Sequence, residues 1–137
     1  MTQISKNFSL NEFTDSITAT NRKIDNTPTK ESIVNITLLV ENILQPIRYK
    51  FGKAIFVGSG FRTPKLNSAV GGSDSSQHMT GEAADITAGN PIDNKKLFDM
   101  IMASGLPFDQ LIDEYDYQWV HVSYSKKRNR RQVLHIK

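Results

Sequence analysis

The sequence contains no cysteine, so disulfides and thiolate metal sites are both excluded. A transition metal would have to bind nitrogen and oxygen ligands, which favours an open catalytic site over a closed structural one. The chain has no run of 18 apolar residues, so no membrane span is expected. Residues 1–6 are polar and no apolar segment follows them, so no secretory signal is expected. These absences predict a protein that is cytoplasmic as synthesised.

Length and apolar content fit one compact domain. The chain has 137 residues, of which 38% are apolar, and this size leaves no room for a second core. We therefore expect a single domain over residues 1–137 and a monomeric protein.

The positive charge is concentrated in Lys126–Arg131, which we call the basic segment. Its five cations exceed the net charge of +3, so the rest of the chain carries −2. Such a segment could contact nucleic acid, anionic lipid or an acidic wall polymer, or it could be the solvated tip of a hairpin. It lacks the interleaved aromatic residues of a single-strand binder, and the chain has no recognition-helix pattern, so no nucleic-acid partner is expected.

Three helices are predicted from their capping signals and apolar spacing. They begin at Ser9, which forms a capping box with Glu12, at Thr27-Pro28, and at Asn90-Pro91. The second is expected to bend at Pro46 and end at Gly52, and the third to end at Gly105. The residues expected on their core faces are Leu10, Phe13 and Ile17, then Ile33, Ile36, Val40, Ile43, Leu44 and Ile47, and finally Ile92, Leu97, Phe98 and Ile101.

Five segments have the composition of strands. They are Ala54–Val57, expected to be buried, Glu82–Thr87, Phe108–Ile112, Tyr117–Tyr124 and Gln132–Ile136. The last is expected to pair with the strand before it, across the basic segment. Residues 63–80 show no periodicity and are predicted to form a long functional loop. Helices followed by a hairpin indicate an α+β fold with a small antiparallel sheet and packed helices.

His78 and Asp85 are the strongest candidates for metal binding. They lie seven residues apart in the stretch Ser75–Ile86, a spacing that suits two ligands of one metal. A catalytic zinc takes about three protein ligands and leaves a fourth position open. His121, in a segment with the composition of a strand, is a candidate for the third ligand.

Several pieces of the chain resemble the M15 zinc peptidases in order and spacing. The pieces are Ser59-Gly60-Phe61-Arg62, Asn67, Val70-Gly71-Gly72, Ser76-Gln77-His78 with Gly81, Ala83 and Asp85, and Trp119-Val120-His121-Val122-Ser123. This family contains D-alanyl-D-alanine carboxypeptidases, dipeptidases and phage endolysins that cut peptidoglycan stem peptides. The resemblance runs from about residue 8 to residue 124. It implies a zinc ion held by His78, Asp85 and His121, and the fold shared by D-Ala-D-Ala peptidases and the Hedgehog signalling domain.

The residue at the usual position of the general base differs from that of many relatives. They have an acid three residues before the last histidine, where this chain has Gln118, which cannot take a proton. The nearby carboxylates are Asp113, Glu114 and Asp116. Glu114 is predicted to be the base, because family members with a Trp-Val-His-Val-Ser ending resemble this chain in keeping a glutamate after a Gln-Leu-Ile run.

Four residues are predicted to bind substrate. By resemblance, Arg62 contacts a substrate carbonyl or carboxylate and takes part in catalysis, with a surface arginine as the alternative. Ser76 and Gln77 flank His78 and either orient it or line the cleft. Trp119 is two residues before His121, so both point to one face of a strand, where the indole forms a cleft wall or part of the core.

These features predict a zinc metallopeptidase that hydrolyses peptide bonds of peptidoglycan stem peptides. It would be a D-Ala-D-Ala carboxypeptidase or an endolysin-type endopeptidase, reaching the wall after lysis or holin-type release. The alternative is a cell-wall binding module that retains the metal but is catalytically weak, which the glutamine at position 118 favours.

Overall fold

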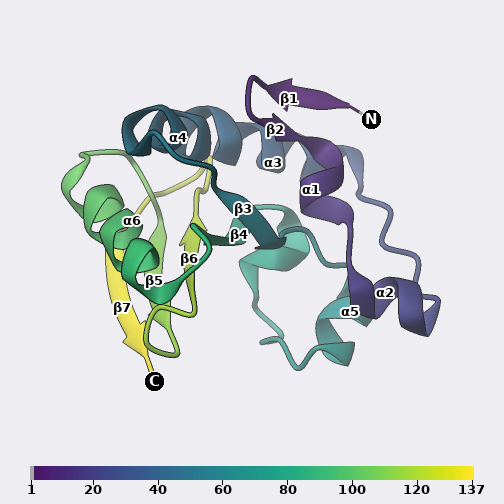
Figure 1. Ribbon diagram of the computed structural model, residues 1–137. Coiled ribbons are helices and arrows are strands. Elements are labelled where there is room, and N and C mark those ends of the chain that lie inside the picture. Colours follow the sequence, from purple (N-terminus) through teal and green to yellow (C-terminus); the bar gives the residue numbers. More distant parts are fainter. Residues whose placement is uncertain (1) are drawn as a thin grey trace.

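A computed structural model describes residues 2–137, and its organising element is a five-stranded sheet (Figure 1). In spatial order the strands are β3 (Phe56–Ser59), β4 (Ala83–Thr87), β6 (Trp119–Ser123), β5 (Gln110–Glu114) and β7 (Gln132–Ile136). The first four are antiparallel to their neighbours, whereas β7 runs parallel to β5. A second sheet pairs β1 (Gln3–Ser5) antiparallel with β2 (Phe8–Ser9).

The helices pack around the larger sheet. In chain order they are α1 (Leu10–Thr14), α2 (Ile17–Arg22), α3 (Lys30–Leu39), the π-helical turn η1 (Val40–Leu44), α4 (Gln45–Phe51), α5 (Pro64–Ala69), the 3-10 turn η2 (Gln77–Thr80) and α6 (Pro91–Ala103). The predicted α+β class is confirmed. Within residues 2–137 no helix combines the length and apolar character needed to cross a bilayer.

The pairing of β7 differs from the predicted hairpin. β6 already has β4 on one side and β5 on the other, so it has no free edge for β7. The basic segment instead crosses to the open edge of β5, where the Arg131 amide donates to the Phe108 carbonyl at 3.0 Å. A parallel pair requires such a crossover. The basic segment is therefore a crossover connection and not a hairpin tip, and the sheet is mixed rather than purely antiparallel.

The capping box predicted at Ser9 is present, but the helix it begins is short. The Ser9 amide donates to Glu12 Oε2 at 2.6 Å. The chain becomes extended at Asp15, and the Ser16 hydroxyl then caps α2 as a separate helix. Ile17 begins α2 with 82% of its surface exposed, so its predicted place on the core face is wrong.

The long helix predicted from Thr27-Pro28 begins two residues later. The Thr29 hydroxyl accepts a hydrogen bond from the Ser32 amide at 3.1 Å, which makes Thr29 the N-cap. The helix then runs through α3, η1 and α4 to Gly52, whose left-handed backbone (φ 73°) ends it as predicted. The π-helical turn ends just before Pro46, which has no amide hydrogen to donate to an α-helical bond. Where a bend was predicted at Pro46, the structure has a π-helical turn just before that residue.

Residues 63–80, predicted to be an irregular loop, contain α5 and η2. The Thr63 hydroxyl caps α5 by accepting from the Leu66 amide at 3.3 Å. The Ser76 hydroxyl caps η2 by accepting from the His78 amide at 3.2 Å. Both helices are too short to show the periodicity from which helices are predicted. His78 therefore sits on a capped turn rather than in a loop.

Side chains of the larger sheet alternate between two faces. One face packs against the helical layer and forms the core, with Ala84, Ile86, Leu111, Val120 and Val122 fully buried. Besides Ile17, three further residues predicted to be buried are exposed. They are Ile92 in the first turn of α6 (73%), Phe56 in the edge strand β3 (57%) and Ala54, which precedes that strand. The face opposite the core carries the polar residues of the site.

Candidate metal centre

Asp85 and His121 face each other across two neighbouring strands. β4 and β6 are antiparallel with Asp85 directly opposite His121. Both side chains lie on the face turned away from the core, because their neighbours in the strands point into it. His78 reaches the same place from η2, which precedes β4 in the chain.

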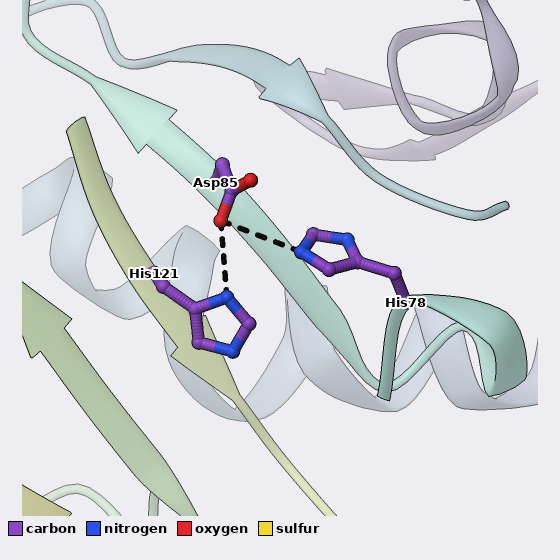
Figure 2. A group of neighbouring side chains, drawn as sticks. All are labelled: His78, Asp85 and His121. Atoms are coloured by element: carbon purple, nitrogen blue, oxygen red, sulfur yellow. Dashed lines mark hydrogen bonds and ion pairs between the residues drawn. The ribbon is translucent and has the colours of Figure 1, made fainter. Parts of the chain in front are cut away.

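The three side chains form one close group (Figure 2). Asp85 Oδ1 lies 3.0 Å from His121 Nδ1 and 3.4 Å from His78 Nε2. The imidazole rings meet edge to face, with centroids 5.1 Å apart. One donor atom from each residue lies within 4.8 Å of the other two. Donor atoms about 2.1 Å from a tetrahedral zinc ion would be roughly 3.4 Å apart, so small side-chain movements bring this group to zinc-binding distances.

The second hydrogen bond of His78 prepares its ring for a metal. Nδ1 lies 2.7 Å from the Gly60 carbonyl oxygen, which can only accept, so Nδ1 carries the proton. When the ring is neutral, Nε2 therefore keeps its lone pair, and Nε2 is the atom that faces Asp85. Metal-binding histidines usually have such a partner on the other nitrogen. Two imidazoles and a carboxylate, held in this way, fit a zinc ion with an open position.

Gly60 occupies a place where a side chain would not fit. A Cβ there would lie 2.6 Å from both the Cα and the carbonyl oxygen of Phe13. The adjacent Phe61 amide donates to that same oxygen at 2.6 Å, and the Arg62 amide donates to the His78 carbonyl at 2.9 Å. The segment after β3 thus binds α1 on one side and holds both the ring and the backbone of His78 on the other.

Asp85 is held in the ionised state that a metal ligand requires. Burial alone would raise the pKa of this carboxyl. Hydrogen bonds from His121 and His78, with attraction to both rings, outweigh burial and lower the pKa below its ordinary value. The Arg62 guanidinium adds a positive charge, with Nη2 3.6 Å from Asp85 Oδ2.

The family profile of peptidase M15 matches residues 6–123, a range that includes all three members of this group. The chain belongs to the peptidase M15 family. The family predicted from the sequence is thereby confirmed. A zinc D-Ala-D-Ala carboxypeptidase of Streptomyces albus G is 50% identical over 48 residues, which cover 34% of this chain and 19% of that relative. The match therefore spans only a small part of the relative's length.

In this M15 chain Arg62 lies beside the metal-binding group and is held in place by two neighbours. Its Nε donates to Ser59 Oγ at 3.1 Å, and its Nη1 donates to Asn67 Oδ1 at 3.2 Å. Gly72 packs closely here, since a Cβ would lie 2.1 Å from Asn67 Oδ1. No role was predicted for Ser59, Asn67 and Gly72 from the sequence. The one indication in the sequence that these residues matter was that they belong to the pieces that resemble M15 peptidases.

Glu114 and Trp119 share the cleft face of the sheet with His121. Trp119 is two residues before His121 in β6 and pairs with Glu114 of β5, so the three side chains point to one side. The Trp119 indole Nε1 donates to Glu114 Oε2 at 2.6 Å. Diagonal neighbours on adjacent strands are roughly 7–8 Å apart, which puts Glu114 next to His121. All three residues line an open cleft.

Asp113 lies on the opposite face and is fully engaged there. It is 6% exposed. Its Oδ1 accepts from the Tyr117 amide at 2.6 Å, and its Oδ2 lies 3.2 Å from Nδ1 of His135, whose ring packs on Phe98. Asp113, one alternative to Glu114 as the base, therefore points away from the cleft and cannot act there.

The turn between β5 and β6 has an unusual backbone. Tyr115, Asp116 and Tyr117 have φ angles of 52°, 55° and 64°, a left-handed conformation that costs a non-glycine residue roughly 1–2 kcal/mol. The Tyr115 amide donates to the Ile136 carbonyl at 2.7 Å, which ties the turn to β7. Gln118 follows the turn and lines the cleft. Hydrogen bonds at both ends hold the turn in this conformation.

Gln77 contacts Asp109 rather than the His78 ring. Its Nε2 donates to Asp109 Oδ2 at 2.8 Å. Arg130 binds the same carboxylate through Nε at 2.8 Å and Nη2 at 3.0 Å. These Arg130 bonds are the main reason that the pKa of Asp109 falls to about 2. A chain of polar contacts thus connects η2 to the basic segment.

Fewer cations of the basic segment are available to a partner than its sequence indicates. Besides the Arg130 contact, Lys126 forms an ion pair with Glu31 near the start of α3. Arg131 lies over the Phe108 ring, with the guanidinium carbon 5.5 Å from the ring centroid. Lys127 and Arg128 are exposed and line the cleft, and in the part of the chain that the structure describes they have no ion-pair partner. Two of the five cations therefore remain available.

Proposed function

We propose that this M15 protein is a zinc peptidase that hydrolyses peptide bonds of peptidoglycan stem peptides. The observation that carries the proposal is the His78–Asp85–His121 group on the wall of an open cleft, in a chain of the M15 family. The relative named as a zinc D-Ala-D-Ala carboxypeptidase supports both the metal and the substrate class. The bond would be either a terminal D-Ala-D-Ala bond or an internal bond cut by an endolysin-type enzyme. We further propose that residues 1–137 act as one peptidase domain.

His78, Asp85 and His121 would hold the zinc ion through two imidazole nitrogens and a carboxylate. When bound, zinc supplies Lewis acidity, which polarises the scissile carbonyl and lowers the pKa of a water molecule. Gly60 and Arg62 support this role from outside the ligand set, since one fixes the His78 ring and the other lies beside the Asp85 carboxylate.

Glu114 would take the proton from the attacking water and deliver it to the leaving amine. It is supported by its place on the cleft face next to His121. Gln118 lines the same cleft but has only an amide to offer. Asp113 is occupied on the other face of the sheet, which leaves Glu114 as the best placed acid of this turn.

Substrate would lie along the cleft between Arg62 and Trp119. Arg62 would donate to a substrate carbonyl or carboxylate. Trp119 would form part of the cleft wall, and Ser76 and Gln77, which line the cleft near His78, would contact the peptide. The Ser76 hydroxyl already accepts from the His78 amide and Gln77 Nε2 already donates to Asp109, whereas Gln77 Oε1 is buried and has no hydrogen-bond partner within residues 2–137.

The second candidate function is a cell-wall binding module that keeps the metal and turns over slowly. It is favoured by one observation, the amide of Gln118 in the cleft where an acid is usual in many relatives. The two functions differ in whether a purified, zinc-loaded protein cuts muropeptides or only binds them.

Mass spectrometry of purified muropeptides incubated with the zinc-loaded protein tests the proposal and identifies the bond. We expect cleavage, with loss of D-alanine for a carboxypeptidase and two shorter peptides for an endopeptidase. Glu114→Gln should retain stoichiometric zinc and lose roughly 10²–10⁴-fold in turnover. Asp116→Asn, a change of the exposed acid in the same turn, is the matched control and should be fully active. Uncut muropeptides would favour the binding module, and an active Glu114→Gln protein would remove Glu114 from the mechanism.

A further inference from the structure

We propose that Trp119 is a positioning residue, whose indole N–H holds the Glu114 carboxylate in one orientation on the cleft face beside His121. This inference rests on the proposed role of Glu114 as the base. It assigns Trp119 a task beyond that of a wall for the substrate, and it gives this chain a device that compensates for the amide of Gln118.

The geometry of the pair is specific. Glu114 and Trp119 are direct cross-strand neighbours of β5 and β6, and the indole Nε1 lies 2.6 Å from Glu114 Oε2. Within residues 2–137 this is the one hydrogen bond made by the Glu114 carboxylate. The glutamate side chain has three rotatable bonds, so without the indole the carboxylate would sample several directions over the cleft.

The indole is itself held in place. The Tyr115 ring meets it edge to face, with centroids 5.2 Å apart and planes at 62°. Tyr115 is placed by the left-handed turn described above, and its amide is tied to Ile136 in β7. Trp119 is also fixed by its place in β6, between two neighbouring strands. The backbone and the ring of Trp119 are therefore both held in place by contacts other than the one with Glu114.

The chemistry of the contact suits a group that must accept and release a proton. An indole N–H is a donor only and does not titrate in water, so it binds one carboxylate oxygen at every working pH. The second oxygen, Oε1, is left to take the proton. Because a protonated carboxyl can still accept at its carbonyl oxygen, Glu114 can pass through a catalytic cycle without losing its anchor.

Trp119→Phe separates the hydrogen bond from the aromatic wall, because phenylalanine keeps a ring against Tyr115 but has no N–H. We expect kcat to fall roughly tenfold to a hundredfold, since a hydrogen bond to a charged group is lost, while KM stays within about twofold. Zinc content should be unchanged. A rise in KM with kcat intact would instead make Trp119 only a wall and overturn the inference.

Two further measurements distinguish a failure of this inference from a failure of the proposed function. In a Glu114→Gln background, Trp119→Phe should have almost no additional effect on kcat, because the carboxylate that the indole orients is gone. If Glu114→Gln is inactive while Trp119→Phe matches the wild type, the positioning role fails and the base stands. If Glu114→Gln is active, the base itself is wrong.

Fluorescence gives a readout that does not depend on activity. Trp119 is the single tryptophan of the chain, so its emission reports directly on this contact. At neutral pH the emission of the zinc-loaded Glu114→Gln protein should differ from that of the wild-type protein, because the indole N–H then faces a neutral amide instead of a carboxylate. Identical emission spectra for the two proteins would show that the indole does not sense the Glu114 carboxylate and would overturn the inference.

Discussion

Replacing Gly60 by alanine should damage the candidate metal centre without changing any of its three residues. The added Cβ would lie 2.6 Å from the Cα and the carbonyl oxygen of Phe13, and these are backbone atoms that cannot rotate away. Either α1 or the segment after β3 must therefore move. The Gly60 carbonyl accepts from His78 Nδ1 at 2.7 Å, so a shift of this segment changes the orientation of the His78 ring.

The size of the effect follows from these contacts. Overpacking of this kind costs about 1–3 kcal/mol of unfolding free energy, or roughly 4–12 °C in Tm for a chain of this length. Disturbing the partner of a metal-bound histidine costs about 10–100-fold in metal affinity. We expect Gly60→Ala to show both losses, in a thermal melt with and without chelator and in a zinc competition titration.

Gly58→Ala is the matched control. It lies two residues away on β3, where a Cβ would meet only the Asp85 carbonyl oxygen at an ordinary 3.7 Å. It should melt within about 2 °C of the wild type, as a substitution without strain does, and bind zinc equally well. If Gly60→Ala behaves like Gly58→Ala, the carbonyl of residue 60 does not control the orientation of the His78 ring.

His121→Ala should release zinc on dialysis, because it removes one of two imidazole donors; stoichiometric zinc by elemental analysis would show that the ligand set is wrong. The lowered pKa of Asp109, about 2 against an ordinary 3.8, contributes stability that is complete above pH 3.8 and lost as the pH falls through 2. Asp109→Asn should therefore reduce the fall in Tm over that window, and an unchanged slope would exclude the Arg130 pair as a source of stability. Exchanging Lys127 and Arg128 for glutamine should weaken sedimentation with cell walls at low salt, since attraction between exposed charges is screened over about 8 Å at physiological salt. Hydrolysis of a soluble muropeptide should stay unchanged, and an equal loss on both substrates would place the basic segment in the active site.

The three residues of the candidate metal centre could be named from the sequence, but their arrangement could not. His78 and Asp85 share one motif, and His121 lies in a segment with a clear strand pattern. The structure brings them together because β4 and β6 pair with Asp85 opposite His121, a contact across 36 residues of chain. Register between distant strands has no local signal, and a slip of one residue would turn Asp85 into the core. Here the resemblance to M15 peptidases supplied what periodicity could not.

The errors in the predicted fold have local physical causes. Thr27 carries a capping signal, but its amide and hydroxyl both bond to Asp25 Oδ1, at 3.0 and 2.6 Å, so Thr29 caps the helix instead. The strand Gln132–Ile136 was recognised, yet its partner depends on which edge of the sheet is free, and only the assembled sheet shows that β6 has none. The contact between Trp119 and Glu114 was missed because the sequence does not show that these two residues are paired.

The bond from the Tyr115 amide to the Ile136 carbonyl has a consequence for biosynthesis. Ile136 belongs to β7, the last of the five strands to leave the ribosome, and β7 docks on β5 in parallel. The turn that carries Tyr115 and leads into Trp119 therefore lacks one of its hydrogen bonds while β7 is still unmade, even if the core beneath it has already folded. Full activity would then appear only at a late step of folding. Substitutions that slow the docking of β7 should accordingly delay the appearance of activity more than the appearance of compact structure.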